Sequence, residues 1–474
     1  MTNNPLPLKD RMQIQRHTMP AQAPQKRVSN FNEVNQGFSS ELAREEAQRC
    51  LQCKDAPCSQ GCPVHVHIPD FIDQILAGNM LGAADAILQD NLLPAVCGRV
   101  CPQEKFCESR CVLGKKGNPV AIGSLERFTA DSTAADRAAR PQGEKPAPTG
   151  KKVALIGSGP SSLACAGDLI RFGHEVTVYE ALHAFGGVLI YGIPEFRLPK
   201  SIVAYEVDVL RRLGVKFEKN VVIGKTLTIN ELFDEQGYDA VFIGAGAGLP
   251  NFLGIPGEEL IGIYSSNELL TRVNLMKAYQ DQSVTPIFNF KDKVVAVFGA
   301  GNTALDSART SLRLGAKEVH IIYRRSEEEM PARHEEVEHA KEEGVKFTFL
   351  AAPLEFLDNG EGWLKGVRLQ RMELGEPDAS GRRRPLPIEG SEFTLDLDLT
   401  VIAIGNGSNP LLRDTPELQF TRRGTLEVNP ESLQTDKAGV FAGGDIVTGG
   451  ATVISAMGAG RQAAQSINDY LSQL

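Results

Sequence analysis

The sequence lacks the features of membrane and nucleic-acid-binding proteins. No apolar run among its 474 residues approaches the ~20 residues of a membrane-spanning helix. Residues 1–24 are polar and Pro-rich and have no apolar core of a signal peptide. The net charge is −9 and no basic stripe occurs, which argues against a nucleic-acid partner. We therefore expect a cytoplasmic protein without a membrane or nucleic-acid partner, and the length predicts about two to four domains.

Residue sets for protein-based catalysis are also scarce. Only eight histidines occur, and no Ser-His-Asp, paired-carboxylate or metal-hydrolase constellation is evident. After Cys111 the only cysteine is Cys165, so no C-x-x-C pair of a disulfide reductase accompanies the glycine-rich turns described below. His65 and His67 flank the cysteines, but the thiols already supply enough donors, which favours surface or supporting roles. We expect no catalytic side chain and chemistry supplied by cofactors.

The other eight cysteines lie in two groups near the N-terminus. Cys50, Cys53, Cys58 and Cys62 read C-x2-C-x4-C-x3-C-P, and Cys97, Cys101, Cys107 and Cys111 read C-x3-C-P-x4-C-x3-C. Soft thiolates at such spacings suit zinc or iron–sulfur clusters. The C-P pairs favour iron–sulfur, because ferredoxin runs carry a Pro after the last ligand, whereas zinc sites tend to pair two C-x2-C units. Structural zinc and disulfides remain alternatives, although cytosolic thiols stay reduced.

Local patterns divide the chain into a helical region and an α/β region. Residues 1–130 read as helix and loop, with a Ser39-capped helix leading to Cys50 and one or two amphipathic helices over 69–88. Residues 131–150, rich in Ala, Arg, Pro and Lys without apolar periodicity, read as a linker. Buried strand runs then alternate with helices, which predicts βαβ units with parallel sheets.

The first glycine-rich turn follows a strand at 152–156. Gly157 makes the tight turn, and Gly159 lets the backbone approach a pyrophosphate at the N-terminus of the next helix. Glu180 ends the following strand, where an acid accepts the ribose hydroxyls, and Ser162 replaces the third glycine of the pattern. This register predicts a dinucleotide site, and the alternative is an ordinary Gly-rich turn.

A motif near the C-terminus indicates that this dinucleotide is FAD. The run G-V-F-A-G-G-D at 439–445 looks like the second FAD motif of two-dinucleotide flavoproteins, in which a strand delivers an Asp to the ribityl chain. The helix over about 451–471 would aim its N-terminus at the flavin pyrimidine and stabilise negative charge there. The residues expected to bind FAD are Gly157, Gly159, Pro160, Ser161, Glu180, Gly186, Gly187, Gly192, Ile193, Arg197, Gly444, Asp445 and Thr452.

The same pattern recurs from residue 293. A strand at 293–298 ends in G-A-G-N-T-A at 299–304, and the next strand, at 318–323, ends in Arg324 and Arg325 instead of an acid. The 2′-phosphate of NADP needs cationic donors, so this charge favours NADP over NAD, unless the two arginines are merely solvated. The residues expected to bind NADPH are Gly299, Gly301, Asn302, Thr303, Arg324 and Arg325.

These motifs together resemble the NADPH-dependent glutamate synthase small (β) subunit family. The resemblance runs from about Phe31 to Leu471 and includes both cysteine groups, both glycine turns, G-I-P-E-F-R-L-P at 192–199, L-G-E-P-D at 374–378 and A-G-G-D at 442–445. The large subunit of NADH-dependent reduced ferredoxin:NADP oxidoreductase is closely similar, and the N-terminal half of dihydropyrimidine dehydrogenase is more distantly so. The resemblance implies an α/β fold: a helical iron–sulfur domain over 1–130, a Rossmann-like FAD domain over 151–285 and 409–474, and an inserted Rossmann-like NADPH domain over 286–408.

The resemblance also implies two 4Fe–4S clusters with interleaved ligands. Cys50, Cys53, Cys58 and Cys111 would hold one cluster, and Cys62, Cys101, Cys107 and Glu126 would hold the other. A carboxylate is a harder ligand than a thiolate and shifts the potential of a cluster. Cys97 would then be a spare buried thiol, although composition alone leaves Cys97 open as the eighth ligand.

The implied activity is electron transfer between cofactors. A hydride would pass between NADP(H) and FAD, and single electrons would pass through the clusters to a partner subunit. No amidotransferase domain or (β/α)8-sized region is evident, so substrate chemistry would lie on that partner. The partner would be the glutamate synthase large subunit, which makes glutamate from glutamine and 2-oxoglutarate, or the smaller flavin and 2Fe–2S subunit of the bifurcating ferredoxin enzyme. Two other classes stay open: a zinc-stabilised scaffold with vestigial nucleotide sites, and a free-standing NADPH oxidoreductase acting on a small molecule.

Overall fold

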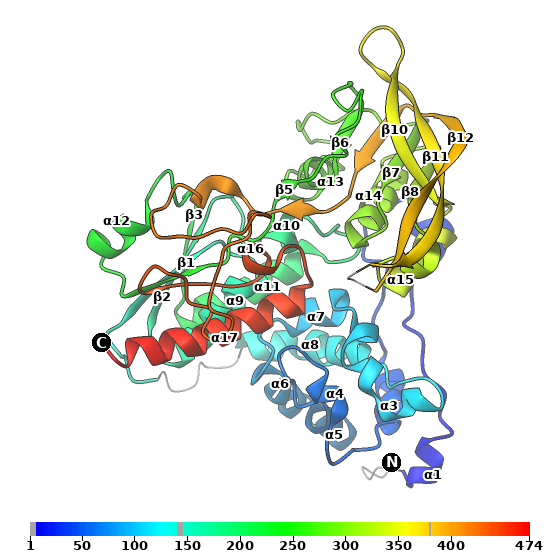
Figure 1. The fold of residues 1–474 in the computed structure, drawn as a ribbon. Coiled ribbons are helices and arrows are strands. Elements are labelled where there is room, and N and C mark those ends of the chain that lie inside the picture. Colours follow the sequence, from blue (N-terminus) through cyan, green and yellow to red (C-terminus); the bar gives the residue numbers. More distant parts are fainter. Residues whose placement is uncertain (1–5, 140–145, 379–380) are drawn as a thin grey trace.

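The computed structural model describes residues 6–139, 146–378 and 381–474. A helical N-terminal region lies beneath two α/β units, and a long antiparallel ribbon extends along the second unit (Figure 1). Within the described part of the chain, no helix is both long enough and apolar enough to cross a bilayer.

The N-terminal region, residues 6–139, consists of short helices and loops. Its helices are α1 (Leu8–Arg11), α2 (Pro24–Arg27), α3 (Ser40–Gln48), α4 (Pro57–Gln60), α5 (Ile68–Ala77), α6 (Met80–Leu88), α7 (Pro94–Val100) and α8 (Ile122–Ala139), with 3-10 turns at Gln103–Lys105, Glu108–Arg110 and Val112–Lys115. The Ser39 cap is confirmed, since its hydroxyl accepts a hydrogen bond from the Leu42 amide (3.2 Å). The helices α5 and α6 occupy the segment where one or two amphipathic helices were expected.

The structure corrects the predicted linker over 131–150, because α8 continues to Ala139. Asp131 accepts hydrogen bonds from the Arg99 guanidinium (2.8 and 2.9 Å), and the Tyr205 hydroxyl donates to the Ala134 carbonyl (3.0 Å). These contacts come from distant segments and hold a helix whose sequence shows no apolar periodicity. Residues 140–145 of the predicted linker lie outside the described residues.

The first α/β unit is a parallel five-stranded sheet in the order β15-β4-β1-β2-β3. Its strands are β1 (Lys152–Ile156), β2 (Glu175–Glu180), β3 (Lys216–Lys219), β4 (Ala240–Ile243) and β15 (Val440–Ala442). Its helices are α9 (Pro160–Arg171), α10 (Val188–Tyr191), α11 (Lys200–Leu213), α12 (Ile229–Asp234), α16 (Asp445–Thr448) and α17 (Val453–Leu471). Because the strands are parallel, the ends of β1, β2, β4 and β15 meet at one edge, where the glycine turn lies.

The second α/β unit repeats this plan in the order β6-β13-β7-β8-β9, again with parallel pairing. Its strands are β6 (Ile263–Ser265), β7 (Val294–Phe298), β8 (Glu318–Tyr323), β9 (Lys346–Phe349) and β13 (Leu399–Ile402). Its helices are α13 (Ser266–Leu270), α14 (Asn302–Arg313) and α15 (His334–Glu342), with a π-helical turn at Thr271–Leu275 and a 3-10 turn at Glu327–Glu329. The glycine strand again lies in the middle of the sheet, as in the first unit.

The boundary predicted at 285/286 lies too late in the chain. The strand β6 pairs with β13, so residues assigned to the FAD domain belong to the second sheet. The chain crosses between the units at β5 (Leu249–Pro250) and β14 (Asn406–Gly407), which pair with each other antiparallel. The sequence could not place this crossing, because the three-residue edge strand β6 is too short to show a hydrophobic period.

The antiparallel ribbon consists of β10 (Ala351–Asp358), β11 (Leu364–Pro377) and β12 (Arg383–Asp396). The strands β11 and β12 are 14 residues each and extend the ribbon beyond β10 (Figure 1). A 3-10 turn at Pro410–Leu412 follows the return to the first unit.

One hydrophobic core joins the helical region to the first α/β unit. It includes Phe71 of α5, Leu163 of α9 and Met457 of α17, whereas the second unit has a core of its own. The helix α17 passes so close to the cysteine region that a Cβ on Gly458 would lie 2.8 Å from the Pro63 carbonyl oxygen. Arg461 of the same helix donates to the Val64 carbonyl oxygen (3.1 Å). The cysteine region and the first unit are therefore packed as one body.

Candidate functional site

Four cysteines of the helical region line one cavity. Cys50, Cys53, Cys58 and Cys111 surround it, together with apolar side chains that include Ile68. Burial, with neighbouring thiols adding to it, raises the pKa of Cys50 to about 12 and that of Cys58 to about 11. Four thiols that share an apolar cavity fit a metal site, because a bound metal supplies the charge that stabilises thiolates.

The backbone of this region adopts conformations that side chains usually avoid. Gln52, Ala56 and His65 have φ of 53°, 37° and 60°, in the left-handed region. Such residues persist where the surroundings over-determine them, and they cluster at binding sites. Here they lie between or just after the cysteines of the first run, where they turn the chain between successive thiols.

A second group of donors lies deeper, against the first α/β unit. Cys62, Cys101, Cys107 and Glu126 are all buried, and the Glu126 carboxylate adds to burial in raising the pKa of each of the three thiols. Oε1 of Glu126 accepts a hydrogen bond from the Asn91 amide (2.6 Å), while burial raises the Glu126 pKa to about 7. These four donors therefore lie near one another, and the division into two ligand sets stays a prediction.

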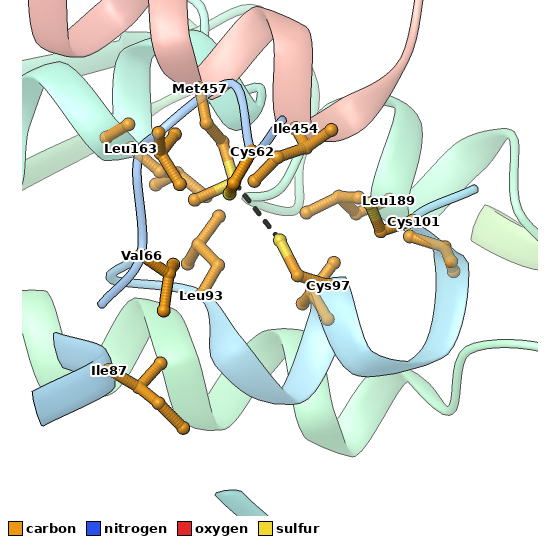
Figure 2. Close-up of a cluster of buried hydrophobic side chains, with 14 of the residues drawn as sticks. Cys62, Val66, Ile87, Leu93, Cys97, Cys101, Leu163, Leu189, Ile454 and Met457 are labelled. Carbon is orange, nitrogen blue, oxygen red and sulfur yellow. Dashed lines mark hydrogen bonds between the residues drawn. The ribbon is translucent and has the colours of Figure 1, made fainter. Parts of the chain in front are cut away.

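Cys97 lies beside the second set but points toward α17. Its Sγ lies 3.5 Å from Sδ of Met457 and 3.7 Å from Oδ1 of Asn91, among the apolar side chains of Leu189 and Ile454 (Figure 2). This packing fits a buried structural thiol. Glu126 as the eighth ligand stays a prediction.

A single bound metal ion needs donors that converge on one point. Zinc binds sulfur at ~2.3 Å, so its ligands crowd around one point. Among the described residues, no three His, Cys, Asp or Glu side chains are grouped closely enough to hold one metal ion. The choice between a cluster and a single ion stays a prediction.

The glycine turn of the first α/β unit is sterically suited to a pyrophosphate. Gly157 has φ of 90°, and a Cβ there would lie 2.7 Å from the Gly244 carbonyl oxygen. Gly187 has φ of 54°, and a Cβ there would lie 2.8 Å from Cα of Gly159. The turn leads into α9 with Pro160 as its first residue, followed by Ser161, so the free amides of the helix N-terminus face the turn. Gly244, which follows β4 in the run G-A-G-A-G, was missed by the sequence reasoning although its strand-plus-glycine pattern was visible.

Glu180 lies at this turn, but its carboxylate is already bonded. Oε2 accepts hydrogen bonds from the Ser158 amide (3.0 Å) and hydroxyl (2.5 Å), and Oε1 accepts one from the Leu182 amide (2.8 Å). The Ser158 hydroxyl in turn accepts a hydrogen bond from the Gly186 amide (2.9 Å). Glu180 and Ser158 therefore hold the glycine turn and the Gly186–Gly187 pair together. Ser158 is a further residue that the sequence reasoning missed.

The C-terminal motif also lies near the first glycine turn. Asp445 is half-buried, burial raises its pKa to about 6, and its carboxylate accepts a hydrogen bond from the Ala451 amide (3.2 Å). Burial, and after it the carboxylates of Asp445 and Glu180, raise the pKa of Tyr191 to about 12. Tyr191, which precedes Gly192 and Ile193, therefore lies near both acids, so the three predicted FAD segments converge.

Two predicted FAD residues have structural roles that the sequence did not show. Thr452 caps α17, since its hydroxyl accepts a hydrogen bond from the Ser455 amide (3.2 Å). Gly444, with φ of 80°, precedes α16, and a Cβ there would lie 3.0 Å from Oγ of Ser161. Both residues shape the backbone around the first glycine turn.

The structure corrects the prediction for Arg197, which points into the second α/β unit. Its buried guanidinium donates to both carboxylate oxygens of Asp306 (2.9 and 2.8 Å) and pairs with Glu336 (3.1 Å). The two acids lie on helices of the other unit, a partnership that no local pattern reveals. Lys200, not predicted, donates from Nζ to the carbonyl oxygens of Leu189 (3.0 Å), Leu198 (3.0 Å) and Ile193.

The second α/β unit presents a matching glycine turn. Gly299 has φ of 129°, and a Cβ there would lie 2.2 Å from the Ala403 carbonyl oxygen. Gly301 precedes α14, and Oδ1 of Asn302 accepts a hydrogen bond from the Arg333 amide (3.0 Å). Thr303 follows in the first turn of α14, where its carbonyl accepts a hydrogen bond from the Ser307 hydroxyl.

The predicted arginine pair is split by the fold. Arg324 is exposed, whereas Arg325 is buried and has side-chain partners. Nη2 of Arg325 donates to the Asp378 carboxylate (2.7 Å), and Nε donates to the Arg383 carbonyl oxygen (2.7 Å). Only Arg324 presents its charge to solvent at the strand end.

Comparisons with known proteins agree with this geometry. Residues 27–138 match the family described as dihydropyrimidine dehydrogenase domain II, 4Fe–4S cluster, and residues 127–460 match that described as pyridine nucleotide-disulphide oxidoreductase. The glutamate synthase [NADPH] small chain of Escherichia coli is 37% identical over 97% of this chain and 98% of that protein. The putative oxidoreductase AegA of the same organism is 39% identical over 94% and 68%.

Other similar proteins are covered over a smaller share of their length or of this chain. The NADP(+)-dependent formate dehydrogenase subunit beta of Moorella thermoacetica is 41% identical over 88% of this chain and 60% of that protein. Among solved structures, Mycobacterium tuberculosis FprA in complex with NADPH has a TM-score of 0.55 at 23% identity, covering 68% of this chain and 84% of that one. The FprA likeness shows a shared fold.

The fold and the sites define an NAD(P)-dependent flavin and iron–sulfur oxidoreductase. Its two dinucleotide units carry sites for FAD and NADPH, and its helical domain carries an iron–sulfur site. The chain belongs to the glutamate synthase small-chain family, with relatives that are 37–39% identical over most of its length.

Proposed function

We propose that the chain is the NADPH-oxidising electron-transfer subunit of a glutamate synthase, with substrate chemistry on a separate large subunit. The observation that carries the proposal is the packing of the Cys62–Pro63 segment on α17, the helix that begins at the FAD site. This packing links the dinucleotide site directly to the buried donor set. A free-standing enzyme for a small substrate would not need that link.

The residues present suit the cofactors that the family implies. When bound, FAD exchanges a hydride with the nicotinamide and single electrons with iron–sulfur groups. The chain's part is to bind and orient: Gly157 and Gly299 admit the two pyrophosphates, and the Thr452-capped N-terminus of α17 offers a positive dipole to the flavin.

We further propose two 4Fe–4S clusters of different exposure. The inner set, Cys62, Cys101, Cys107 and Glu126, is buried, whereas Cys53, Cys58 and Cys111 of the outer set are partly exposed. The partner would dock over the outer set, nearest the surface. Iron and sulfide should each be about eight per chain, as two 4Fe–4S clusters require.

The eighth ligand can be tested by a matched pair of variants. Glu126→Ala should change the EPR signal or potential of one cluster and spare the other, while Cys97→Ser should do little. The opposite outcome would exchange the two assignments. Zinc at about two per chain without iron would instead support the scaffold alternative, which oxidoreductase relatives do not favour.

The partner proposal rests on relatives named glutamate synthase small chain. They favour that enzyme over the bifurcating ferredoxin oxidoreductase. The test combines the purified chain with a glutamate synthase large subunit and follows NADPH-dependent glutamate formation from glutamine and 2-oxoglutarate. A chain that reduces ferricyanide with NADPH but forms no glutamate with that subunit would keep the oxidoreductase and exclude this partner.

A further inference from the structure

The turn of the β11–β12 ribbon reaches back to the end of β8. The two strands pair as far as Pro377 and Arg383, so Asp378 and Arg383 flank the turn. Residues 379 and 380, at its centre, are not described. Both flanking residues bond to the segment that follows β8, where the Leu350 amide, just before β10, also donates to the Arg325 carbonyl oxygen (3.2 Å).

This segment adjoins the glycine turn of the second unit. The Gly299 amide donates to the Ile322 carbonyl oxygen (3.1 Å), so the turn lies directly beside the end of β8. In such a unit the adenosine ribose and its 2′-substituent lie at the end of the second strand. Arg324, exposed at that point, is a cation that can reach a 2′-phosphate there.

Three glutamates follow the arginine pair after Ser326, and each has a cationic partner. Arg383 pairs with Glu328 (2.7 Å) and with Glu329, while Lys341 pairs with Glu327 (2.6 Å). Without Arg383, two carboxylates would lose their counter-charge within a few residues of Arg324. Uncompensated carboxylates near a phosphate site oppose binding of the phosphate.

The ribbon also fixes the backbone of the arginine pair. Arg325 is 5% exposed, and its guanidinium bonds to Asp378 and to the Arg383 carbonyl oxygen, both at 2.7 Å. Arg325 thereby anchors the segment, and Arg324 is held at the surface beside it. The sequence pattern assigns phosphate recognition to both arginines. The contacts instead leave Arg324 as a cation for the ligand and make Arg325 a residue that anchors the backbone.

We propose that Asp378 and Arg383, at the turn of the ribbon, are positioning residues that set the preference for NADPH over NADH. Asp378 holds the Arg324–Arg325 segment through Arg325, and Arg383 neutralises Glu328 and Glu329 beside the 2′-phosphate position. This inference rests on the proposed NADPH-oxidising function and names residues outside the dinucleotide fold that tune it.

The test measures KM for NADPH and for NADH with the holoprotein, using ferricyanide as acceptor. Arg383→Ala should raise KM for NADPH by about tenfold and leave KM for NADH within about twofold, because NADH has no 2′-phosphate. Arg383→Lys should recover most of the NADPH affinity. The matched control is Arg368→Ala on the same ribbon, whose exposed pair with Glu355 (2.8 Å) lies away from the turn, and neither KM should change.

A charge-rescue variant separates electrostatics from damage to the fold. Glu328 has a side chain that is 82% exposed, so Glu328→Gln should fold, and in the Arg383→Ala background it should lower KM for NADPH again. Asp378→Asn should raise KM for NADPH alone, as Arg383→Ala does. Equal changes for NADPH and NADH, or no rescue by Glu328→Gln, would overturn the inference.

The ratio of KM for NADH to KM for NADPH in the wild-type protein separates a failure of this inference from a failure of the proposed function. A wild-type protein that prefers NADPH, with variants that keep its ratio, would refute the role of the ribbon and leave the proposed function standing. A wild-type protein that prefers NADH would refute the NADPH assignment and this inference together.

Discussion

The two α/β units use one backbone plan for two different ligands. In both, the glycine strand lies in the middle of a five-stranded parallel sheet, and the turn amide donates to the end of the neighbouring strand: Gly157 to Tyr179 (2.8 Å) and Gly299 to Ile322 (3.1 Å). They differ at the end of that strand, where Glu180 stands in one unit and Arg324 in the other. The comparison teaches that the turn supplies pyrophosphate binding and that a few side chains select the ligand.

The units also differ in how they are attached to the rest of the molecule. The first shares its hydrophobic core with the cysteine region. The second has its own core and meets the first through buried ion pairs, chiefly Arg197 with Asp306 and Glu336. Apolar packing suits a permanent junction, whereas buried charges fix one orientation because each needs its partner.

The largest expected effect comes from filling each glycine turn. Gly157→Val would place atoms against the Gly244 carbonyl, and Gly299→Val against the Ala403 carbonyl. The first variant should lose its flavin, while the second should keep flavin and lose NADPH-driven bleaching but not reduction by dithionite. Flavin content and stopped-flow absorbance measure both results. Gly237→Val is the matched control, since Gly237 also has a positive φ (68°) but no neighbour within 4 Å of its Cβ position.

The next effect concerns the ionic junction between the units. Arg197→Met would leave Asp306 and Glu336 without their partner and should destabilise the protein by about 3–5 kcal/mol in a urea titration. Arg211→Met, which breaks an exposed pair with Asp208 (2.8 Å), should cost about 0–1 kcal/mol. Similar losses in the two variants would show that the buried pairs contribute no more than surface ones.

The charge difference at the strand ends should appear as coenzyme preference. Replacing Arg324 and Arg325 together by Ala should raise KM for NADPH by about one to two orders of magnitude and that for NADH much less. The exposed position of Arg324 predicts that Arg324→Ala alone produces most of the effect on binding. Bleaching that is equally fast with NADH, and insensitive to the double change, would contradict the NADP assignment.

The smallest effect is a pH dependence that falls in a different pH range for each unit. Burial lowers the pKa of Lys200, in the first unit, to about 7, while Glu195 and Asp306 act in the opposite direction. The unfolded lysine keeps its proton to ~10.4, so stability should rise with pH between these values, and Lys200→Met should lack that rise.

In the second unit stability also rises with pH, but in the acid range. Arg197 and Arg309 hold the pKa of Glu336 near 2 despite its burial. Its stabilising contribution is present above the ordinary value of ~4.3 and is lost as pH falls toward 2. Unfolding midpoints are measured from about pH 2 to pH 9 for wild type, Lys200→Met and Glu336→Gln. Lys200→Met should lack the rise in stability above neutral pH, and Glu336→Gln should lack the rise in the acid range.

Much of the fold was readable from sequence because its signals are local. The strand at 318–323 and the strand at 152–156 lie where their apolar runs predict, since burial on both faces of a parallel sheet demands such runs. Gly157 and Gly299 were identified because only glycine adopts their backbone angles without strain. The crowding of thiols likewise indicated a metal-binding domain before any contact was known.

What the sequence could not determine depends on partners that are distant along the chain. Tertiary contacts bring Cys111 to the cavity of the first cysteine run and Arg197 to its acidic partners. They also bring Arg325 to the ribbon turn, 53 residues later in the chain. The same holds for the helical part of the predicted linker and for β6, which are ordered by neighbours from other segments. Backbone angles and apolar periods are local properties of a chain, whereas ligand sets and ion pairs exist only once folding has chosen which segments meet.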